Sequence, residues 1–149
     1  MIKVSPMPSV EEFKLTLKSL GLKATAQRVA VHEAMLELVH ASADTVAEKI
    51  SERGEVKVNT SSVYNILSQM SLYGIYRSVL SANNKMYFDV NNSKHVHLYD
   101  TVNHEFKDVA DEELYDMIEG KLRKRRFRGY KIDGVSVTIS CHPTHRKTV

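Results

Sequence analysis

The sequence predicts an α+β fold made of two small lobes, and three observations support this prediction. Apolar residues recur at helical spacing through most of the first 80 residues. Residues 75–90 alternate apolar and polar side chains around Ser81-Ala82-Asn83-Asn84, a pattern typical of a β-hairpin. From residue 95 onwards the spacing switches between strand-like and helix-like segments. A chain of 149 residues is long enough for two lobes, and we place the boundary between residues 1–90 and 91–149.

Four helices are expected in the first lobe. Ser9 and Glu12 form a capping box at the start of an apolar stripe that stops at Gly21. The caps expected for the next three helices are Thr25, then Ser42, then either Asn59 or Thr60. Helices followed by a hairpin are the layout of a winged helix.

The fourth helix has an outward face of short or flat hydrogen-bonding side chains and almost no acids. Its members are Thr60, Ser61, Ser62, Tyr64, Asn65, Ser68 and Gln69. A helix that enters the major groove needs donors and acceptors of this kind, and a carboxylate there would repel phosphate. Any solvated helix also has a polar face, so the pattern indicates DNA binding only in combination with the winged-helix layout.

The second lobe is expected to be a small α/β domain. The segments predicted are strands at 95–99 and 106–109, a helix at 111–126 and a long strand at 132–140 that carries Val135, Val137 and Ile139. The apolar side chains of such a long strand in so small a lobe are expected to be buried by a partner subunit, which predicts a homodimer. A two-fold dimer also suits the reading of two DNA half-sites.

Composition excludes several classes of protein. With 42% hydrophobic and 26% charged residues, the chain should fold. Its one cysteine, Cys141, rules out a disulfide within the chain, and the apolar runs are shorter than the ~20 residues of a membrane span. We therefore expect a cytoplasmic protein with no membrane partner. Acidic residues are concentrated in residues 100–119 and basic residues in residues 121–131. We interpret this pattern mainly as a solvent-exposed helix whose acids at the start and bases at the end complement the helix dipole. Attraction of phosphate by the basic residues is a lesser possibility.

Five scattered side chains suit a divalent metal. They are His40, Asp89, His95, His97 and Asp108. Imidazole and carboxylate without thiolate favour iron(II), manganese(II) or zinc over copper(I) or a cluster. Each histidine alone is more often an ordinary polar residue. A His/Asp cluster can also activate water in a hydrolase, but no general base or nucleophile lies at a recognisable spacing from these residues.

Several short segments, in their order and approximate spacing, resemble the ferric uptake regulator family. They are GLKATAQR at 21–28, HASAD at 40–44, SSVYNIL at 61–67, Phe88-Asp89, HVHL at 95–98 and FKD at 106–108. The resemblance spans about residues 10–142. It implies a dimeric, metal-dependent DNA-binding repressor with an N-terminal winged-helix DNA-binding domain and a small α/β dimerisation domain, and not an enzyme.

The resemblance also implies roles for individual residues. The five His and Asp side chains match the family's regulatory metal site, with Fe²⁺ or Mn²⁺ expected and Zn²⁺ possible, and one ion would join the two lobes. Aspartate at both 89 and 108 is most similar to the peroxide-responsive branch, in which peroxide would oxidise His40 or His95 and release DNA. On the DNA side, Tyr64 matches a base contact, Arg28 a backbone contact and Lys23 a residue near the minor groove. Ser61 and Asn65 are additional expected contacts to an inverted-repeat operator.

The chain also departs from the family pattern. Where the family usually has the first of two cysteine pairs that hold a structural zinc, this chain has Asp100 and Asn103, and the second pair is absent. We therefore expect no structural zinc held by four cysteines. A second family site is also damaged, because Lys94 and Val96 stand at ligand positions although His142 matches. A haem- or small-ligand-responsive regulator, a metal-independent architectural protein and a metal-dependent hydrolase remain alternatives.

Overall fold

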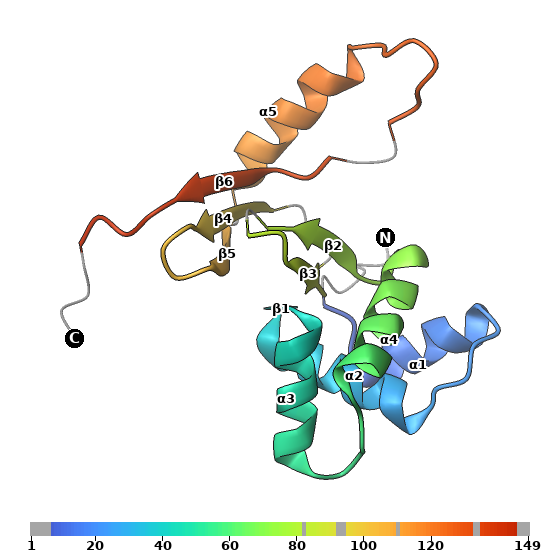
Figure 1. Ribbon diagram of the computed structural model, residues 1–149. Coiled ribbons are helices and arrows are strands. Elements are labelled where there is room, and N and C mark those ends of the chain that lie inside the picture. The colour runs from blue at the N-terminus through green and yellow to red at the C-terminus, as the bar shows by residue number, and fades with distance from the viewer. Residues whose placement is uncertain (1–6, 82, 92–94, 110, 133–134, 146–149) are drawn as a thin grey trace. The chain divides into compact units, whose positions relative to one another are not determined.

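The computed structural model describes residues 7–81, 83–91, 95–109, 111–132 and 135–145. The chain divides into two compact units, residues 1–93 and residues 94–149. Figure 1 labels their helices and strands in chain order. The α+β fold class expected from the sequence is confirmed, with helices first and strands mixed with one helix afterwards.

The first unit contains four helices that begin at the predicted caps. They are α1 (Val10–Ser19), α2 (Ala26–Leu38), α3 (Ala43–Arg53) and α4 (Thr60–Leu72). Both bonds of the Ser9/Glu12 capping box are present, and the Thr25 hydroxyl accepts from the Arg28 N–H at 3.2 Å. At α4 the cap is Asn59, whose Oδ1 accepts from the Ser62 N–H at 2.7 Å. These local bonds satisfy backbone donors that a helix start leaves open.

The core of this unit consists of the apolar stripes of its helices. Side chains from all four are fully shielded from solvent, including Phe13, Val31, Met35, Val46 and Leu67. Helix α2 packs against α1, α3 and α4. Burial of each stripe leaves the polar face of α4 outward, as the helical spacing predicts.

A three-stranded antiparallel sheet completes the first unit. Its strands are β1 (His40–Ala41), β2 (Arg77–Leu80) and β3 (Met86–Asp89), in the order β1-β3-β2. Strands β2 and β3 form the predicted hairpin, which is the wing of the winged helix. Strand β1 was not predicted, because two residues are too few to show an alternating pattern. Its pairing with β3 places His40 directly opposite Asp89.

A stacked aromatic cluster holds α1, α2 and the start of the wing together. The His32 ring lies parallel to Phe13, with centroids 4.2 Å apart, and parallel to Tyr76 at 5.8 Å. His32 Nε2 lies 2.6 Å from the Pro8 carbonyl oxygen, so this nitrogen carries the proton and Nδ1 accepts from the Tyr76 hydroxyl at 2.8 Å. Burial lowers the pKa of His32 and raises the pKa of Tyr76. Both side chains are therefore neutral and structural.

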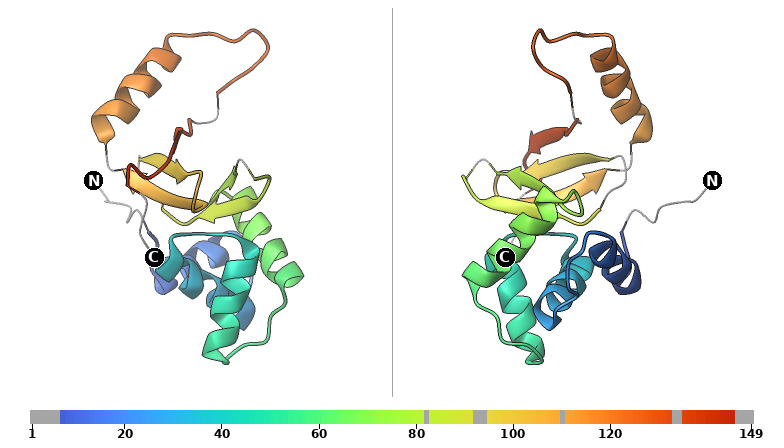
Figure 2. Two further views of the ribbon diagram at one scale, coloured as in Figure 1. Left: turned by 60° about the vertical axis from the view of Figure 1, so that its left-hand side comes forward. Right: turned by 90° about the vertical axis from the view of Figure 1, so that its right-hand side faces the viewer.

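The second unit is a small sheet with one helix. Its elements are β4 (Val96–Asp100), β5 (Glu105–Val109), α5 (Glu112–Arg123) and β6 (Thr138–Cys141). The strand order is β5-β4-β6, with β4 antiparallel to β5 and parallel to β6. Figure 2 shows α5 and the segment that returns from it to β6.

Two predicted boundaries in this unit were wrong. Helix α5 ends at Arg123 and not at residue 126. Strand β6 covers only Thr138–Cys141 and not 132–140, although Val135 and Val137 continue the alternation. Its extent is set by the pairing register, in which His97 to Asp100 of β4 lie opposite Thr138 to Cys141. Periodicity alone cannot show where a neighbouring strand ends.

None of the helices in the described ranges is long and apolar enough to cross a membrane.

Candidate metal centre and DNA-reading face

The first pair of candidate ligands comes from strands β1 and β3. His40 and Asp89 are directly opposite in the register, and His40 Nε2 lies 3.2 Å from Asp89 Oδ2. The Asp89 side chain is only 1% exposed. Its other oxygen, Oδ1, accepts from the Asn91 backbone N–H at 2.8 Å. That bond orients the carboxylate so that Oδ2 faces the imidazole.

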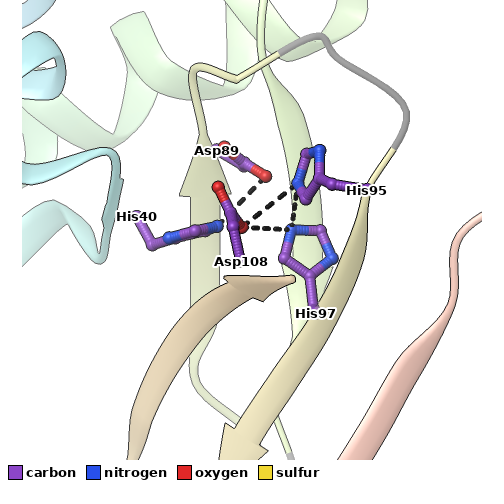
Figure 3. A group of neighbouring side chains, drawn as sticks. All are labelled: His40, Asp89, His95, His97 and Asp108. Carbon is purple, nitrogen blue, oxygen red and sulfur yellow. Dashed lines mark hydrogen bonds and ion pairs between the residues drawn. The ribbon is translucent and has the colours of Figure 1, made fainter. Parts of the chain in front are cut away.

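The second group of candidate ligands comes from strands β4 and β5 and from His95, which directly precedes β4. His97 is directly opposite Asp108, and His95 is two residues earlier, on the same side of the chain. His95 Nε2 lies 2.9 Å from His97 Nε2 and 3.2 Å from Asp108 Oδ1, and His97 Nε2 lies 3.6 Å from that same oxygen. Figure 3 labels these side chains and marks the contacts within each pair or group. Both histidines are almost fully buried.

The donor set fits a divalent metal. In the His95/His97/Asp108 group, the Nε2 atoms of two buried rings point at each other beside a carboxylate oxygen. These two ring nitrogens and the carboxylate oxygen lie close enough together to serve as ligands of one divalent ion. Imidazole nitrogen and carboxylate oxygen suit iron(II), manganese(II) and zinc.

The exposed face of α4 carries the predicted base contact, Tyr64, and the two additional expected contacts, Ser61 and Asn65. Ser61, Tyr64 and Asn65 are all exposed, whereas Val63 and Leu67 on the opposite side are buried. The three line a cavity of about 600 Å³ together with Leu80 and Met86 of the wing. Helix α4 contains no acid that would repel phosphate.

Tyr64 also contacts the sheet behind it. Its ring lies edge-on to Phe88, with centroids 6.1 Å apart, and Phe88 directly precedes the candidate ligand Asp89. The exposed α4 residue and the β3 strand of the candidate ligand are therefore in direct contact within the first unit.

The predicted backbone contact, Arg28, and the residue predicted near the minor groove, Lys23, lie at or just before the start of α2. Lys23 is exposed, and Arg28 is half-buried. Arg28 Nη1 donates to the Lys23 carbonyl at 2.8 Å, and its Nη2 donates to Gln69 Oε1 of α4 at 3.0 Å. Arg28 thus ties the loop before α2 to α4, a positioning role that the sequence did not reveal because Gln69 is 41 residues away.

Lys85, in the hairpin of β2 and β3, is a positively charged residue beside the DNA-reading face that was not predicted from the sequence. It lines the α4 cavity and forms an ion pair with Asp44 at 3.4 Å. A single lysine in a hairpin has no distinguishing pattern, so no sequence signal indicated it.

The positions where the family pattern is broken have ordinary hydrogen bonds. Asp100 accepts from the Asn103 side chain at 2.8 Å and from the backbone N–H groups of Val102 and Asn103. The Asn103 side-chain bond is the main cause that lowers the pKa of Asp100. Cys141 is a free thiol that donates to the Tyr99 carbonyl. Val96 is buried, His142 is exposed, and Lys94 lies outside the described residues.

The first unit is a winged-helix domain and the second a small α/β domain that contains a His/Asp cluster, which together define a metal-responsive transcriptional regulator. The sequence model of the Ferric uptake regulator family matches residues 19–140. This chain belongs to that family, whose members bind DNA and are dimeric, and it is a regulator rather than an enzyme. No curated protein matches the chain by sequence.

Solved structures of regulators share the fold. The Vibrio cholerae ferric uptake regulator is 23% identical with a TM-score of 0.70, and the match covers 88% of this chain and 99% of that one. A Pseudomonas aeruginosa ferric uptake regulator solved with manganese is also 23% identical at 0.70, over 89% and 98%. The Campylobacter jejuni peroxide stress regulator is 23% identical with a TM-score of 0.66, over 89% and 96%.

Proposed function

We propose that this protein is a homodimeric repressor that binds an inverted-repeat operator when one divalent metal ion is held by His40, Asp89, His95, His97 and Asp108. The observation that carries the proposal is the pairing of the ligands. Two His/Asp pairs, His40 with Asp89 and His97 with Asp108, are each directly opposed across antiparallel strands, and His95 joins the second pair.

The donor set supports iron(II) or manganese(II) as the resident ion, with zinc as the alternative. Solved relatives have been obtained with manganese, iron and zinc. A dication bound there would balance the charge of the two aspartates and accept lone pairs from the three imidazoles. The five proposed ligands come from both units of the chain. An ion bound by all five would therefore restrict the orientations that the DNA-reading units can adopt in the dimer.

For the DNA contact, we propose that Tyr64 reads base edges, with Ser61 and Asn65 as additional contacts. Arg28 contacts the phosphate backbone, and Lys23 lies near the minor groove beside the phosphates. The three α4 residues are exposed and polar on a helix without acids. A zinc uptake regulator of the same fold, with a TM-score of 0.60, has been solved with zinc and DNA. A groove-bound helix uses such side chains for direct readout.

Operator binding with defined metals tests the proposal. An operator is first selected from a random duplex pool with manganese-loaded protein, and its affinity is then measured with iron(II), manganese(II), zinc or chelator. We expect metal to tighten specific binding and His97→Ala to abolish that metal dependence, with folding checked by circular dichroism. His145→Ala removes an exposed imidazole that matches no ligand position and serves as the matched control. Equal binding with chelator would show an architectural DNA-binding protein instead.

The two aspartate ligands favour peroxide as the signal over iron availability alone. The test exposes the iron-loaded and manganese-loaded proteins to hydrogen peroxide and follows operator binding and peptide masses. Oxygen addition at His40 or His95 and loss of binding, in the iron form only, support peroxide sensing. Unmodified histidines with undiminished binding would leave metal availability as the signal. A Soret band on haem titration would instead indicate a haem-responsive regulator.

A further inference from the structure

The hollow beside α4 contains a carboxylate at the place where a duplex would approach. The cavity of about 600 Å³ that contains Ser61, Tyr64 and Asn65 is also lined by Asp44, the single acid among its described lining residues. Asp44 lies in the first turn of α3, and its side chain is 58% exposed. A solvent-exposed carboxylate at this position repels the phosphates of DNA. Asp44 therefore opposes the binding that the polar face of α4 favours.

The partner of this carboxylate is the ammonium group of Lys85. Lys85 Nζ lies 3.4 Å from Asp44 Oδ2, and Lys85 is the single base among the described residues that line the cavity. Its side chain is 42% exposed, so both members of the ion pair are in contact with water. An exposed pair contributes little to folding, because water screens it and because two side chains lose freedom. The pair can therefore open at small cost when another anion approaches Lys85.

A tight turn fixes the backbone of Lys85. The Ser81 N–H donates to the Lys85 carbonyl at 2.9 Å, and the Lys85 N–H donates to Ser81 Oγ at 3.3 Å. The Asn84 N–H donates to the Ser81 carbonyl at 2.9 Å, and Asn84 takes a positive φ of 59°. Ser81 itself is buried. A change of partner for Lys85 therefore needs rotation of its side chain and not movement of the hairpin.

We propose that Asp44 is a charge brake on DNA binding: its carboxylate holds Lys85 in the free protein and is replaced by a backbone phosphate in the complex. The inference rests on the proposed DNA contact through α4. Binding then loses the ion pair and brings a phosphate near Asp44, and both effects lower the affinity. Because the phosphate backbone is the same in every sequence, the brake acts on operator and unrelated duplex alike. Specific binding then depends more strongly on the base contacts of α4.

Asp44→Asn tests the brake, because the amide keeps the shape of the side chain and removes its charge. Fluorescence anisotropy of the manganese-loaded protein measures the affinities for operator and scrambled duplex. The salt concentration is about 0.1 M, at which charges more than about 10 Å apart are largely screened. We expect Asp44→Asn to tighten binding to both duplexes by about two- to tenfold. Unchanged affinity for both would overturn the proposal.

An ion pair between α2 and α3 supplies the matched control. Lys49 Nζ lies 3.1 Å from Glu37 Oε2, with side chains 34% and 50% exposed, and neither residue lines the cavity. Glu37→Gln removes the same charge as Asp44→Asn and should change the affinity by less than about twofold, because a distant exposed charge is screened. An equal gain in the two variants would show a general effect of net charge and would overturn the brake.

A double-mutant cycle with Lys85→Gln tests the exchange of partners. With Lys85 present, Asp44→Asn removes both the competition for Lys85 and the repulsion of phosphate, whereas with Lys85→Gln it removes the repulsion alone. We therefore expect a larger gain when Lys85 is present. Lys85→Gln alone should weaken binding and lower the slope of log K against log salt by about one unit. Equal gains in both backgrounds would show that the pair stays closed on DNA, which overturns the exchange.

The same measurements separate failure of the brake from failure of the proposed function. If the wild-type protein shows no preference for the operator, the proposed function fails, and the affinity for scrambled duplex still decides the brake. If Asp44→Asn weakens operator binding alone, Asp44 reads a base, since a carboxylate can accept from cytosine N4. If it weakens binding to both duplexes, Asp44 positions Lys85 for DNA. Either of these last two results would overturn the charge brake.

Discussion

His97 lies directly opposite Asp108 in the antiparallel β4–β5 pair, with 3.6 Å between His97 Nε2 and Asp108 Oδ1. Opposed residues on such strands point to the same side of the sheet, so their spacing is set by the backbone ladder and not by flexible linkers. His40 and Asp89 have the same relationship on β1 and β3. Each half of the proposed metal centre is therefore held in place by main-chain pairing.

Asp108→Asn should weaken manganese binding by more than about 100-fold. Loss of a group that only hydrogen-bonds to a ligand typically costs about 10- to 100-fold, and loss of a ligand itself should cost more. The amide keeps the shape of the side chain but loses the charge that a dication needs. Isothermal titration calorimetry measures the effect. Asp116→Asn neutralises an exposed acid on α5 and should leave the affinity as it is. Unchanged manganese affinity in Asp108→Asn would exclude this residue as a ligand.

Tyr64→Phe should weaken specific operator binding by up to about tenfold, since one hydrogen bond is worth about 0.5–1.5 kcal/mol. The ring contact with Phe88 is retained, so the fold should not change. Fluorescence anisotropy with operator and with scrambled duplex separates specific from non-specific binding. Tyr73→Phe, at the end of α4, is the control. An equal loss on both duplexes would mean that Tyr64 does not read bases.

Lys23→Gln should reduce the steepness with which operator affinity falls with salt. A lysine that contacts one phosphate contributes about one unit to the slope of log K against log salt concentration. Affinity should fall on operator and scrambled duplex alike. Lys18→Gln, on α1, removes an equal charge from an adjacent helix and should keep the wild-type slope. If both variants keep that slope, Lys23 makes no phosphate contact.

The unfolding free energy should fall as the pH drops below about 6.5, the ordinary pKa of histidine. Burial lowers the pKa of His32 in the folded protein, so in this range the unfolded chain binds more protons than the folded one. The contribution of His32 is fully present above the unfolded pKa and is lost as pH falls towards the folded one.

Urea denaturation between pH 7.5 and 5.0 measures this dependence in wild type and in His32→Leu. The variant should be less stable at every pH by about 1–3 kcal/mol, because the Tyr76 hydroxyl loses its acceptor. Its stability should also vary less with pH than that of wild type. Identical slopes in the two proteins would show that His32 does not titrate on unfolding.

Features that depend on neighbouring residues could be predicted well. The capping box at Ser9, the cap at Thr25 and the hairpin strands β2 and β3 all agree with the structure, because each depends on contacts a few residues apart. The family assignment is also confirmed. It rests on short sequence segments in a defined order, which can be recognised without knowing the tertiary structure. The five His and Asp residues were named on this basis and remain a proposal for one site.

Features that depend on distant partners could not be predicted from the chain alone. The two-residue strand β1, the short extent of β6 and the Arg28–Gln69 bond each exist because another segment offers a hydrogen-bonding partner. Local spacing records which face of an element is apolar, but which residues meet across that face depends on long-range pairing, and no local pattern encodes it.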